Sequence, residues 1–497
     1  MGYKSIAAKM AANVLIPGIY REQQQAIAVQ QRLLQHLIAR GKTTDFGRKH
    51  DLQKVKDYAA FKQAVPARDY EGFKHEIERI SEGEENVLWP GRPLYFCKSS
   101  GTTSGAKYIP VSKEQIGEMV KAARNALLSY VYETGKADCF DHKMIFLQGS
   151  PELEKHGVIP TGRLSGIVYN HVPAYAQANR MPSYPTNCIE DWEEKVEAIA
   201  RETLKENMSL ISGIPPWCVM YFEKLLELSG KQTVQEIFPD FKVFMYGGVN
   251  YAPYCNKIEK LIGFKIDSIE TYPASEGFIA YQDSQHAEGL LLNVNGGLFY
   301  EFIKAEDAGK ADAERISLAD VELNTNYALL LTTNAGLWAY EIGDTVKFVS
   351  KNPYRIVVTG RTKHFISAFG EHVIGEEVEF AILRAMRDMH AGVSEFTVAP
   401  QVTPAEGLPY HEWFVEFSHL PPSINSFSGL VDEYLRGKNV YYDDLRKGHV
   451  LQQLKIHALK PGTFVEFMKA KGKLGGQNKV PRLMNDRSIA DELLRML

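Results

Sequence analysis

The segment from Lys98 to Lys107 has the composition of a phosphate-binding loop. It reads KSSGTTSGAK, with two glycines and five hydroxyl side chains between its terminal lysines. Glycine lets the backbone curl so that N–H groups converge, hydroxyls add donors, and lysine adds positive charge. The chain contains neither GxxxxGK[ST] nor GxGxxG, so a Walker loop and a dinucleotide fold have no support. A polar surface turn would have a similar composition.

Three further segments could complete a nucleotide site. YGGVNYAP (246–253) leaves a predicted strand with paired glycines, where a flat ring could approach the backbone. ETYPASEG (270–277) places a tyrosine, a serine and a glutamate together after another strand. YEIGD (340–344) puts an aspartate after a glycine turn, where it could accept both hydroxyls of a ribose. Each alone is equally typical of a turn, a helix cap or a solvated acid.

In chain order, SSGTTSGAK, GGVN, TYPASEG, YEIGD and GRTKHFISAFGEHV resemble the core motifs of the adenylate-forming superfamily. That superfamily includes acyl-CoA synthetases, peptide-synthetase adenylation domains and firefly luciferase. Within it, the chain is more similar to the auxin-responsive acyl acid–amido synthetase family. The features that carry this closer resemblance are FGRKHDL (46–52), SSGTTSG in the loop and GGQNKVPR (475–482). Plant members conjugate hormones such as indole-acetate and jasmonate to amino acids, and bacterial relatives also belong to this branch.

The resemblance implies a role for each motif residue. The catalytic residues would be Lys107 on the leaving phosphates, Glu276 as the magnesium ligand and Lys479 as the mobile lysine that reaches the adenylate. ATP or AMP would be bound by Ser99, Ser100, Gly101, Thr102, Thr103, Gly247, Gly248, Val249, Tyr272, Ser275, Asp344 and Arg361. Among these, Tyr272 would stack on the adenine and Asp344 would hold the ribose. Lys363 occupies the position of the interdomain hinge.

Three positions depart from the usual superfamily pattern. Pro273 stands where a small residue is common, Ser367 where many members have lysine, and Glu341 where arginine is common. Proline also removes one backbone N–H donor beside the expected adenine.

The implied function is an ATP-dependent, AMP-forming ligase that uses ATP and Mg²⁺. It would adenylate a small carboxylic acid and pass the acyl group to an amine, such as an amino acid, to form an amide. A second interpretation keeps the adenylation but transfers the acyl group to a thiol of CoA or a carrier protein. A third is a catalytically silent nucleotide-binding relative. The absence of a GxSxG motif agrees with a mechanism that needs no side-chain nucleophile.

The acyl pocket is expected along the helix at 113–131 and near 163–175 and 213–220. Its candidate lining residues, each of which could equally be a plain core residue, are Met119, Leu127, Tyr130, Val172, Ile214 and Trp217.

Apolar periodicity predicts an α/β fold that would position these motifs. Residues 5–40 have helical periodicity, with a predicted buried face of Ile27, Leu33, Leu34, Leu37 and Ile38. Strand-like runs at 144–148, 208–213, 242–248 and 265–272 alternate with helical segments, which favours parallel pairing. From 289 to 359, closely spaced strands punctuated by Gly and Asn predict hairpins, including separate strands at GLWAYEIG and TVKFVS.

The sequence predicts a large N-terminal α/β domain with mixed sheets and a β-rich subregion, and a small mobile α+β C-terminal domain. The expected bounds are 1–360 for the large ATP- and acyl-binding domain, 361–366 for the hinge and 367–497 for the small lid domain. A length of 497 residues suits several domains of ordinary size.

Bulk composition excludes several other classes. A net charge of −4 without a dominant basic stripe gives no reason to expect nucleic acid. No apolar run approaches the roughly 18 residues of a membrane span. The five cysteines are odd in number and lack CxxC spacing, so neither a disulfide framework nor zinc is expected, and a reducing cytoplasm fits.

Overall fold

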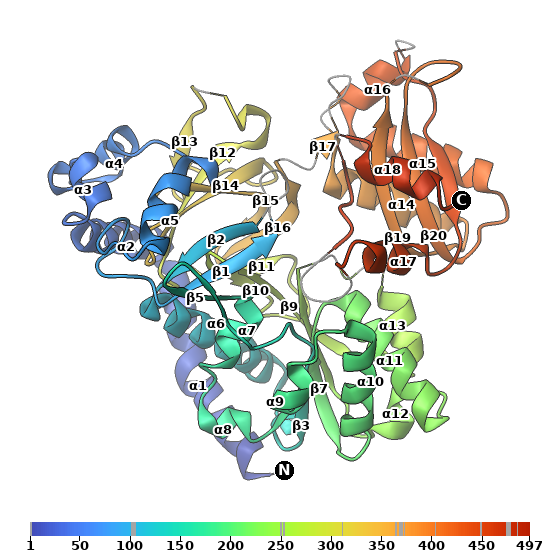
Figure 1. The fold of residues 1–497 in the computed structure, drawn as a ribbon, viewed down its shortest axis with the longest axis horizontal. Helices are drawn as coiled ribbons and strands as arrows, with labels where there is room; N and C mark the ends of the chain where they lie inside the picture. The colour runs from blue at the N-terminus through green and yellow to red at the C-terminus, as the bar shows by residue number, and fades with distance from the viewer. Residues whose placement is uncertain are drawn as a thin grey trace. The chain divides into compact units, whose positions relative to one another are not determined.

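The computed structural model divides the chain into two compact units (Figure 1). The first contains residues 1–250 and 257–357, and the second contains 251–256 and 358–497. The structure describes residues 2–100, 106–248, 251, 254–310, 312–362, 365–366, 371, 373–402, 404–447, 450–473, 479–484 and 486–497. The bounds of the hinge at 361–366 stay a prediction.

The first unit begins with a helical segment that packs on the large sheet. Its helices are α1 (Tyr3–Gln24), α2 (Ala26–Gly41), α3 (Asp45–Lys49), α4 (Tyr58–Ala64) and α5 (Lys74–Ser81). The predicted helix over 5–40 is therefore two helices that meet at Gln25. Of the predicted buried face, Leu34, Leu37 and Ile38 are buried and Leu33 is half-buried. The prediction for Ile27 is wrong, because its side chain is exposed on the outer side of α2.

A twelve-stranded mixed sheet forms the centre of this unit, in the order β13-β12-β14-β15-β16-β11-β10-β9-β8-β7-β3-β6. One part is parallel: β3 (Lys143–Phe146), β6 (Arg180–Met181), β7 (Met208–Ser212), β8 (Val243–Gly247) and β9 (Asp267–Ala274). The pairs β9–β10, β10–β11, β11–β16, β12–β13, β12–β14 and β14–β15 are antiparallel. These strands are β10 (Gly277–Tyr281), β11 (Leu290–Leu292), β12 (Leu298–Lys304), β13 (Arg315–Ser317), β14 (Asn326–Thr333), β15 (Tyr340–Lys351) and β16 (Tyr354–Arg361).

A second sheet carries the predicted phosphate loop. It has the order β2-β1-β5-β4, with β1 (Tyr95–Ser100), β2 (Ala106–Val111), β4 (Glu154–His156) and β5 (Ile159–Gly162). The chain leaves β2 into α6 (Lys113–Thr134), whose first turn is capped by Ser112 accepting from the backbone N–H of Gln115. The remaining helices of the unit are α7 (Leu164–Tyr169), α8 (Ala174–Gln177), α9 (Tyr184–Asn187), α10 (Trp192–Thr203), α11 (Pro215–Ser229) and α12 (Val234–Ile237). The helix α13 (Cys255–Ile262) belongs to this unit from Lys257 onward.

The second unit is an α+β structure with its own core. Its sheet has the order β19-β20-β21, with β19 (Gly392–Gln401), β20 (Tyr410–His419) and β21 (Lys455–Leu459). A short hairpin joins β17 (Phe365–Ile366) to β18 (Val373–Ile374). The helices are α14 (Gly375–Asp388), α15 (Ile424–Lys438), α16 (Val440–Lys447), α17 (Thr463–Ala470) and α18 (Ser488–Leu494). Among the described residues of the whole chain, no helix combines the length and the apolar character that a membrane span requires.

The structure confirms the predicted α/β class and corrects one strand. GLWAYEIG and TVKFVS are not two strands, because Tyr340–Lys351 forms the single long strand β15. A register shift against β14, between Ala328 and Leu330, marks a bulge where the two predicted strands were divided. Gly343 lies in this bulge with a φ of +87°. A glycine in a bulge has the same sequence signature as a glycine in a turn, which is why the sequence predicts a break here.

A buried ion pair links the beginning of the chain to the sheet. Asp283 has a fully buried side chain and accepts two hydrogen bonds from Arg355, one of them 2.9 Å from Nη2 to Oδ2. The hydroxyl of Tyr20 in α1 donates to the same oxygen at 2.8 Å. The carboxylate therefore holds a helix and a strand together.

We expect Asp283→Asn to lower the free energy of unfolding by about 3–5 kcal/mol, because Arg355 would remain buried without a charged partner. Asp307→Asn is the control, since its pair with Lys310 is exposed and should be worth less than about 1 kcal/mol. Urea unfolding of both variants measures the difference. A loss of under 1 kcal/mol for both would contradict this role.

Candidate active site

The ETYPASEG segment forms a tight hairpin in which Ser275 and Glu276 are the turn residues. Ala274 of β9 pairs with Gly277 of β10, which leaves only these two residues to close the turn. Glu276 is 6% exposed, so an acidic residue stands nearly buried at the tip of a hairpin. Burial of a charged group is costly, so a nearly buried carboxylate at the tip of a hairpin makes this turn a candidate for a functional position.

Hydrogen bonds connect this turn to the strand and helix that flank the phosphate loop. The thiol of Cys97 in β1 donates to the hydroxyl of Ser275 at 3.1 Å. The amide of Gln115, in the first turn of α6, donates to the backbone carbonyl of Glu276. The strand that leads into the loop and the helix that follows β2 are therefore both tied to the Ser275–Glu276 turn.

The described part of the phosphate loop places Lys107 at its exit. Lys107 lies opposite Ser99 in the β1–β2 pair, and its Nζ is 5.7 Å from the centre of the Tyr70 ring. Gly101, Thr102 and Thr103 lie outside the described residues, and only the backbone of Ser99 and Ser100 is described. Their phosphate-binding roles stay predictions.

The YGG segment brings the end of β8 next to β9. Gly247 pairs with Thr271, and a Cβ on Gly247 would lie 2.5 Å from the Thr271 carbonyl oxygen. The hydroxyl of Thr271 also donates to the Tyr246 carbonyl at 2.9 Å. Gly248 has a φ of +81°, a left-handed conformation that favours glycine. The close packing of β9 thus gives a structural reason for Gly247, and Val249 lies outside the described residues.

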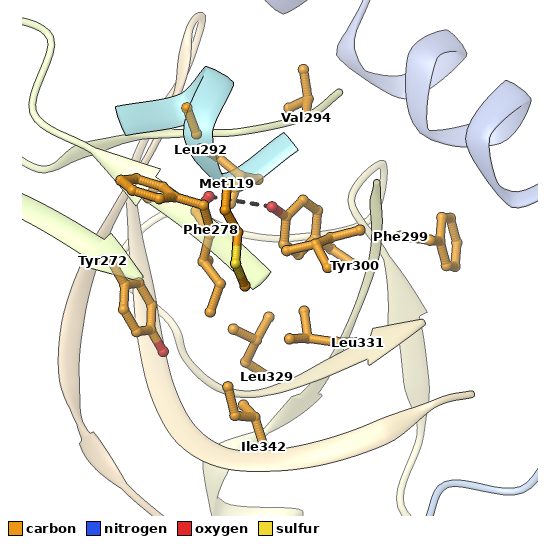
Figure 2. Close-up of a cluster of buried hydrophobic side chains, with 14 of the residues drawn as sticks. Met119, Tyr272, Phe278, Leu292, Val294, Phe299, Tyr300, Leu329, Leu331 and Ile342 are labelled. Atoms are coloured by element: carbon orange, nitrogen blue, oxygen red, sulfur yellow. Dashed lines mark hydrogen bonds between the residues drawn. The ribbon is translucent and has the colours of Figure 1, made fainter. Parts of the chain in front are cut away.

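Tyr272 and Asp344 are brought together from distant parts of the chain. The hydroxyl of Tyr272 in β9 donates to Oδ2 of Asp344, which follows the bulge glycine of β15, at 2.6 Å. Figure 2 shows the Tyr272 ring at the side of a cluster of buried hydrophobic side chains that includes Leu329 and Ile342. The ring is 9% exposed, so it contributes to the core and also orients the carboxylate. Its stacking on adenine stays a prediction.

Pro273 fits the hairpin without disrupting the sheet. It lies two residues past Thr271, the last residue of β9 that pairs with β8, and it pairs with Phe278 on the other side. No β8 ladder bond is lost at this point, which is where proline is tolerated in a strand.

In the second unit, Arg361 is exposed at the last residue of β16 and Lys479 is exposed in the segment before α18. The chain beyond Lys479 is fixed against β19, because Thr397 donates to the Pro481 carbonyl at 2.6 Å. The Val398 N–H donates to the Arg482 carbonyl at 3.0 Å. This pairing gives the KVPR motif a defined position within its own unit. Lys363 lies outside the described residues.

Within the first unit, two side chains that the sequence did not single out connect the elements around the phosphate loop to the TYPASEG turn. Gln115 and Cys97 hold the Ser275–Glu276 turn, and neither belongs to a recognisable motif. The only sequence signal for a role of Gln115 is its position in the first turn of the helix that follows β2. Of the candidate acyl-pocket residues, Met119 belongs to the buried cluster of Figure 2, which favours the plain core interpretation for it.

The cysteine beside the site is not a nucleophile. Burial raises the pKa of the Cys97 thiol to about 12, so it remains protonated at neutral pH. This agrees with a site that acts through charge and hydrogen bonds rather than through a covalent intermediate.

The fold of this chain is shared with solved structures of an acyl acid amido synthetase and an acyl-CoA ligase. The structure is similar to GH3.15 acyl acid amido synthetase, with a TM-score of 0.78 at 17% identity over 95% of this chain and 92% of that one. It is also similar to 2-hydroxyisobutyryl-CoA ligase in complex with an acyl-adenylate, with a TM-score of 0.61 at 11% identity over 95% and 92%. At these identities the likeness concerns the fold.

The chain belongs to the GH3 family. Models of its N-terminal domain match residues 16–178 and 160–265, the central domain matches 291–361 and the C-terminal domain matches 376–488. Indole-3-acetic acid-amido synthetase GH3.4 of Arabidopsis thaliana is 23% identical, over 92% of this chain and 89% of the relative. Jasmonoyl–L-amino acid synthetase JAR4 of Nicotiana attenuata is 21% identical, over 93% and 92%. The resemblance seen in the sequence motifs is thus confirmed, and the named relatives are amide-forming ligases.

We expect Gly343→Ala to weaken ATP binding at least tenfold, because alanine at a φ of +87° would strain the bulge that positions Asp344. Gly309→Ala is a matched control: its φ is +85°, nothing lies within 4 Å of the added Cβ, and it is remote in sequence from these motifs. Both variants should lose about 1 kcal/mol of stability. Equal ATP affinity in the two, measured by calorimetry, would contradict the role of the bulge.

Proposed function

We propose that this chain is an acyl acid–amido synthetase that activates a carboxylic acid with ATP and transfers the acyl group to an amino acid. The observation that carries the proposal is the linkage of the predicted motifs. Hydrogen bonds from Cys97 and Gln115 reach the Ser275–Glu276 turn, and Tyr272 on the adjoining strand reaches Asp344. The names of the relatives, indole-3-acetic acid and jasmonoyl amido synthetases, support amide formation as the outcome.

The donor set at the turn fits a magnesium ion. Mg²⁺ prefers one or two carboxylates and completes its octahedron with phosphate oxygens and water. Glu276 is one nearly buried carboxylate on a turn that is tied to the phosphate loop's flanking elements. We propose that Glu276 holds the ion, which would supply positive charge to the phosphate oxygens. Lys107 and the loop hydroxyls would hold the leaving pyrophosphate.

The first step joins two anions, so its barrier is largely electrostatic. An oxygen of the acid's carboxylate attacks the α-phosphorus of ATP, the bond to the bridging oxygen breaks, and pyrophosphate leaves. Fixed positive groups and donors lower such a barrier because they need no reorganisation as charge moves. We assign Lys107 and Lys479 to this task. Asp344, oriented by Tyr272, would hold the ribose hydroxyls, with Arg361 a second contact.

The second step forms the amide. A neutral amine nitrogen attacks the acyl carbon, the bond to the phosphate oxygen breaks, AMP leaves, and the nitrogen gives up one proton. Movement of the small domain about the proposed hinge at 361–366 would allow one site to serve both steps. Transfer to a thiol remains the alternative product, because the first step would be unchanged.

We expect Glu276→Gln to lower amide formation by about 10²–10³-fold, because the variant loses a charge that interacts with developing phosphate charge. It should also require more Mg²⁺ for half-maximal rate. Glu288→Gln replaces an exposed glutamate on the same unit and should leave the rate unchanged.

The measurement is mass spectrometry of the acyl products formed from ATP, a panel of acids and a panel of amino acids, with CoA in a parallel reaction. An amide that appears with wild type and disappears with Glu276→Gln supports the proposal. A thioester with CoA and no amide would establish the alternative. No product together with intact ATP binding would favour a silent relative.

A further inference from the structure

Arg180 is half-buried as a residue, but two nitrogens of its guanidinium group are fully enclosed. Its guanidinium lies between two aromatic rings, 4.1 Å from the centre of Tyr169 and 4.8 Å from the centre of Phe146. Nη2 donates to Oε1 of Gln148 at 2.7 Å, whereas Nε and Nη1 are buried and have no hydrogen-bond partner. No carboxylate of the described residues forms an ion pair with it, and burial lowers its pKa to about 10. An unpaired buried charge is expensive, so it needs an explanation.

Two more side chains in this region, those of Gln148 and Ser165, have polar atoms without hydrogen-bond partners. Gln148 is 7% exposed, and its Nε2 has no acceptor. The hydroxyl of Ser165, at the start of α7, is buried and also unpartnered. Ser165 lies close to the chain that leaves β3, because a Cβ on Gly149 would be 3.7 Å from its Oγ. All three side chains can donate hydrogen bonds.

The surroundings add two more cations, one of which, Arg163, has the carboxylate of Glu154 as an electrostatic neighbour. Burial lowers the pKa of Arg163, the residue before α7, and lowers that of Lys195 in α10 to about 8. The positive charge of Arg163 also lowers the pKa of Lys195, so the two cations are electrostatic neighbours. Lys195 donates to the Asn187 carbonyl rather than to a carboxylate. This part of the unit is therefore suited to an anion.

The sheet register places this cluster at the same edge as the nucleotide motifs. Phe146 of β3 pairs with Ser212 of β7, and Ser212 pairs with Met245 of β8. Gln148 is two residues past Phe146, and Gly247 is two residues past Met245. With strands about 4.8 Å apart, these two positions are roughly 10 Å from each other. That separation matches the reach of a small substrate bound across the carboxyl ends of parallel strands.

We propose that Arg180, Gln148 and Ser165 bind a second carboxylate of the substrates, at the far end from the reacting centre. The inference rests on the proposed function. The carboxylate could belong to the acyl acid, which would then be a dicarboxylic acid, or to the amino acid acceptor. In both cases the cluster determines specificity and takes no part in bond making. Its donors become satisfied only when the anion is bound.

The test compares wild type with Arg180→Gln, Arg180→Lys and the control Arg201→Gln, which removes an exposed arginine of α10. Acid-dependent exchange of labelled pyrophosphate into ATP, without acceptor, is measured for adipate against hexanoate and for 4-carboxyphenylacetate against phenylacetate. Amide formation is then measured with glycine against glycinamide. Thermal unfolding with and without adipate follows binding directly.

For a diacid, we expect Arg180→Gln to raise the KM roughly ten- to a hundredfold, with an unchanged KM for the matched monoacid and partial recovery in Arg180→Lys. If the carboxylate is that of the acceptor, exchange is unchanged and the KM for glycine rises while that for glycinamide does not. Removing an unpaired buried charge should leave the melting temperature unchanged or raise it. Arg201→Gln should match wild type throughout.

Equal KM values in wild type and Arg180→Gln for every acid and both acceptors would overturn the inference. A marked fall in the melting temperature of Arg180→Gln, with no change in the diacid-to-monoacid ratio of Arg180→Lys, would show a structural role instead. Failure of the proposed function is separate: wild type would then exchange no pyrophosphate with any acid. Stabilisation of wild type by adipate, absent with hexanoate and in Arg180→Gln, would still show the anion site.

Discussion

Parallel pairing of β3, β7, β8 and β9 fixes where the polar groups of the first unit can gather. Strands that run in the same direction end at the same edge, and the segments that follow them meet there. The Gly247–Gly248 turn follows β8, and the Ser275–Glu276 turn follows β9. β1 and α6 add Cys97 and Gln115 to the latter turn from the second sheet. A one-residue shift of β8 on β9 that brought Tyr246 opposite Thr271 would put a side chain at a position where even a Cβ has no room.

The unit uses buried charge in two different ways. Asp283 and Arg355 form a complete pair, with Tyr20 adding a third hydrogen bond, so their charges are compensated within the fold. Arg180 has the same kind of side chain, and among the described residues its guanidinium contacts one amide oxygen and two aromatic faces rather than a carboxylate. The Asp283–Arg355 pair holds elements together. The Arg180 guanidinium instead keeps hydrogen-bond donors that a ligand could use. Stability given up at a functional position is a common compromise in enzymes.

The sequence predicted the fold class, most of the strands and helices, and the family, because these depend on local patterns. Apolar runs with glycine boundaries identified β7, β8 and β14, whereas the phosphate-binding role of the hydroxyl-rich loop stays a prediction. The division of β15 into two strands was wrong, because a bulge glycine resembles a turn until its partner strand is known. The prediction that Ile27 is buried was also wrong. Helical periodicity cannot decide whether an apolar residue at the edge of the apolar face of a helix is buried or exposed.

Contacts between distant residues were beyond the sequence. Tyr272 and Asp344 were each singled out, yet their hydrogen bond depends on the register of strands that are 72 residues apart. Arg180 belongs to no motif, and its significance appears only when the described residues around it provide no carboxylate. The lack of a carboxylate near Arg180 depends on which residues are its neighbours in three dimensions, and spacing along the chain carries no information about those neighbours.

The central claim is that this chain forms an acyl-adenylate, and acid-dependent exchange of labelled pyrophosphate into ATP measures that step directly. The reaction should be run with Mg²⁺ across aryl, indolyl, fatty and dicarboxylic acids. The account predicts exchange that requires both an acid and Mg²⁺, with no exchange when the acid is omitted. ATP binding without exchange for any acid would contradict it.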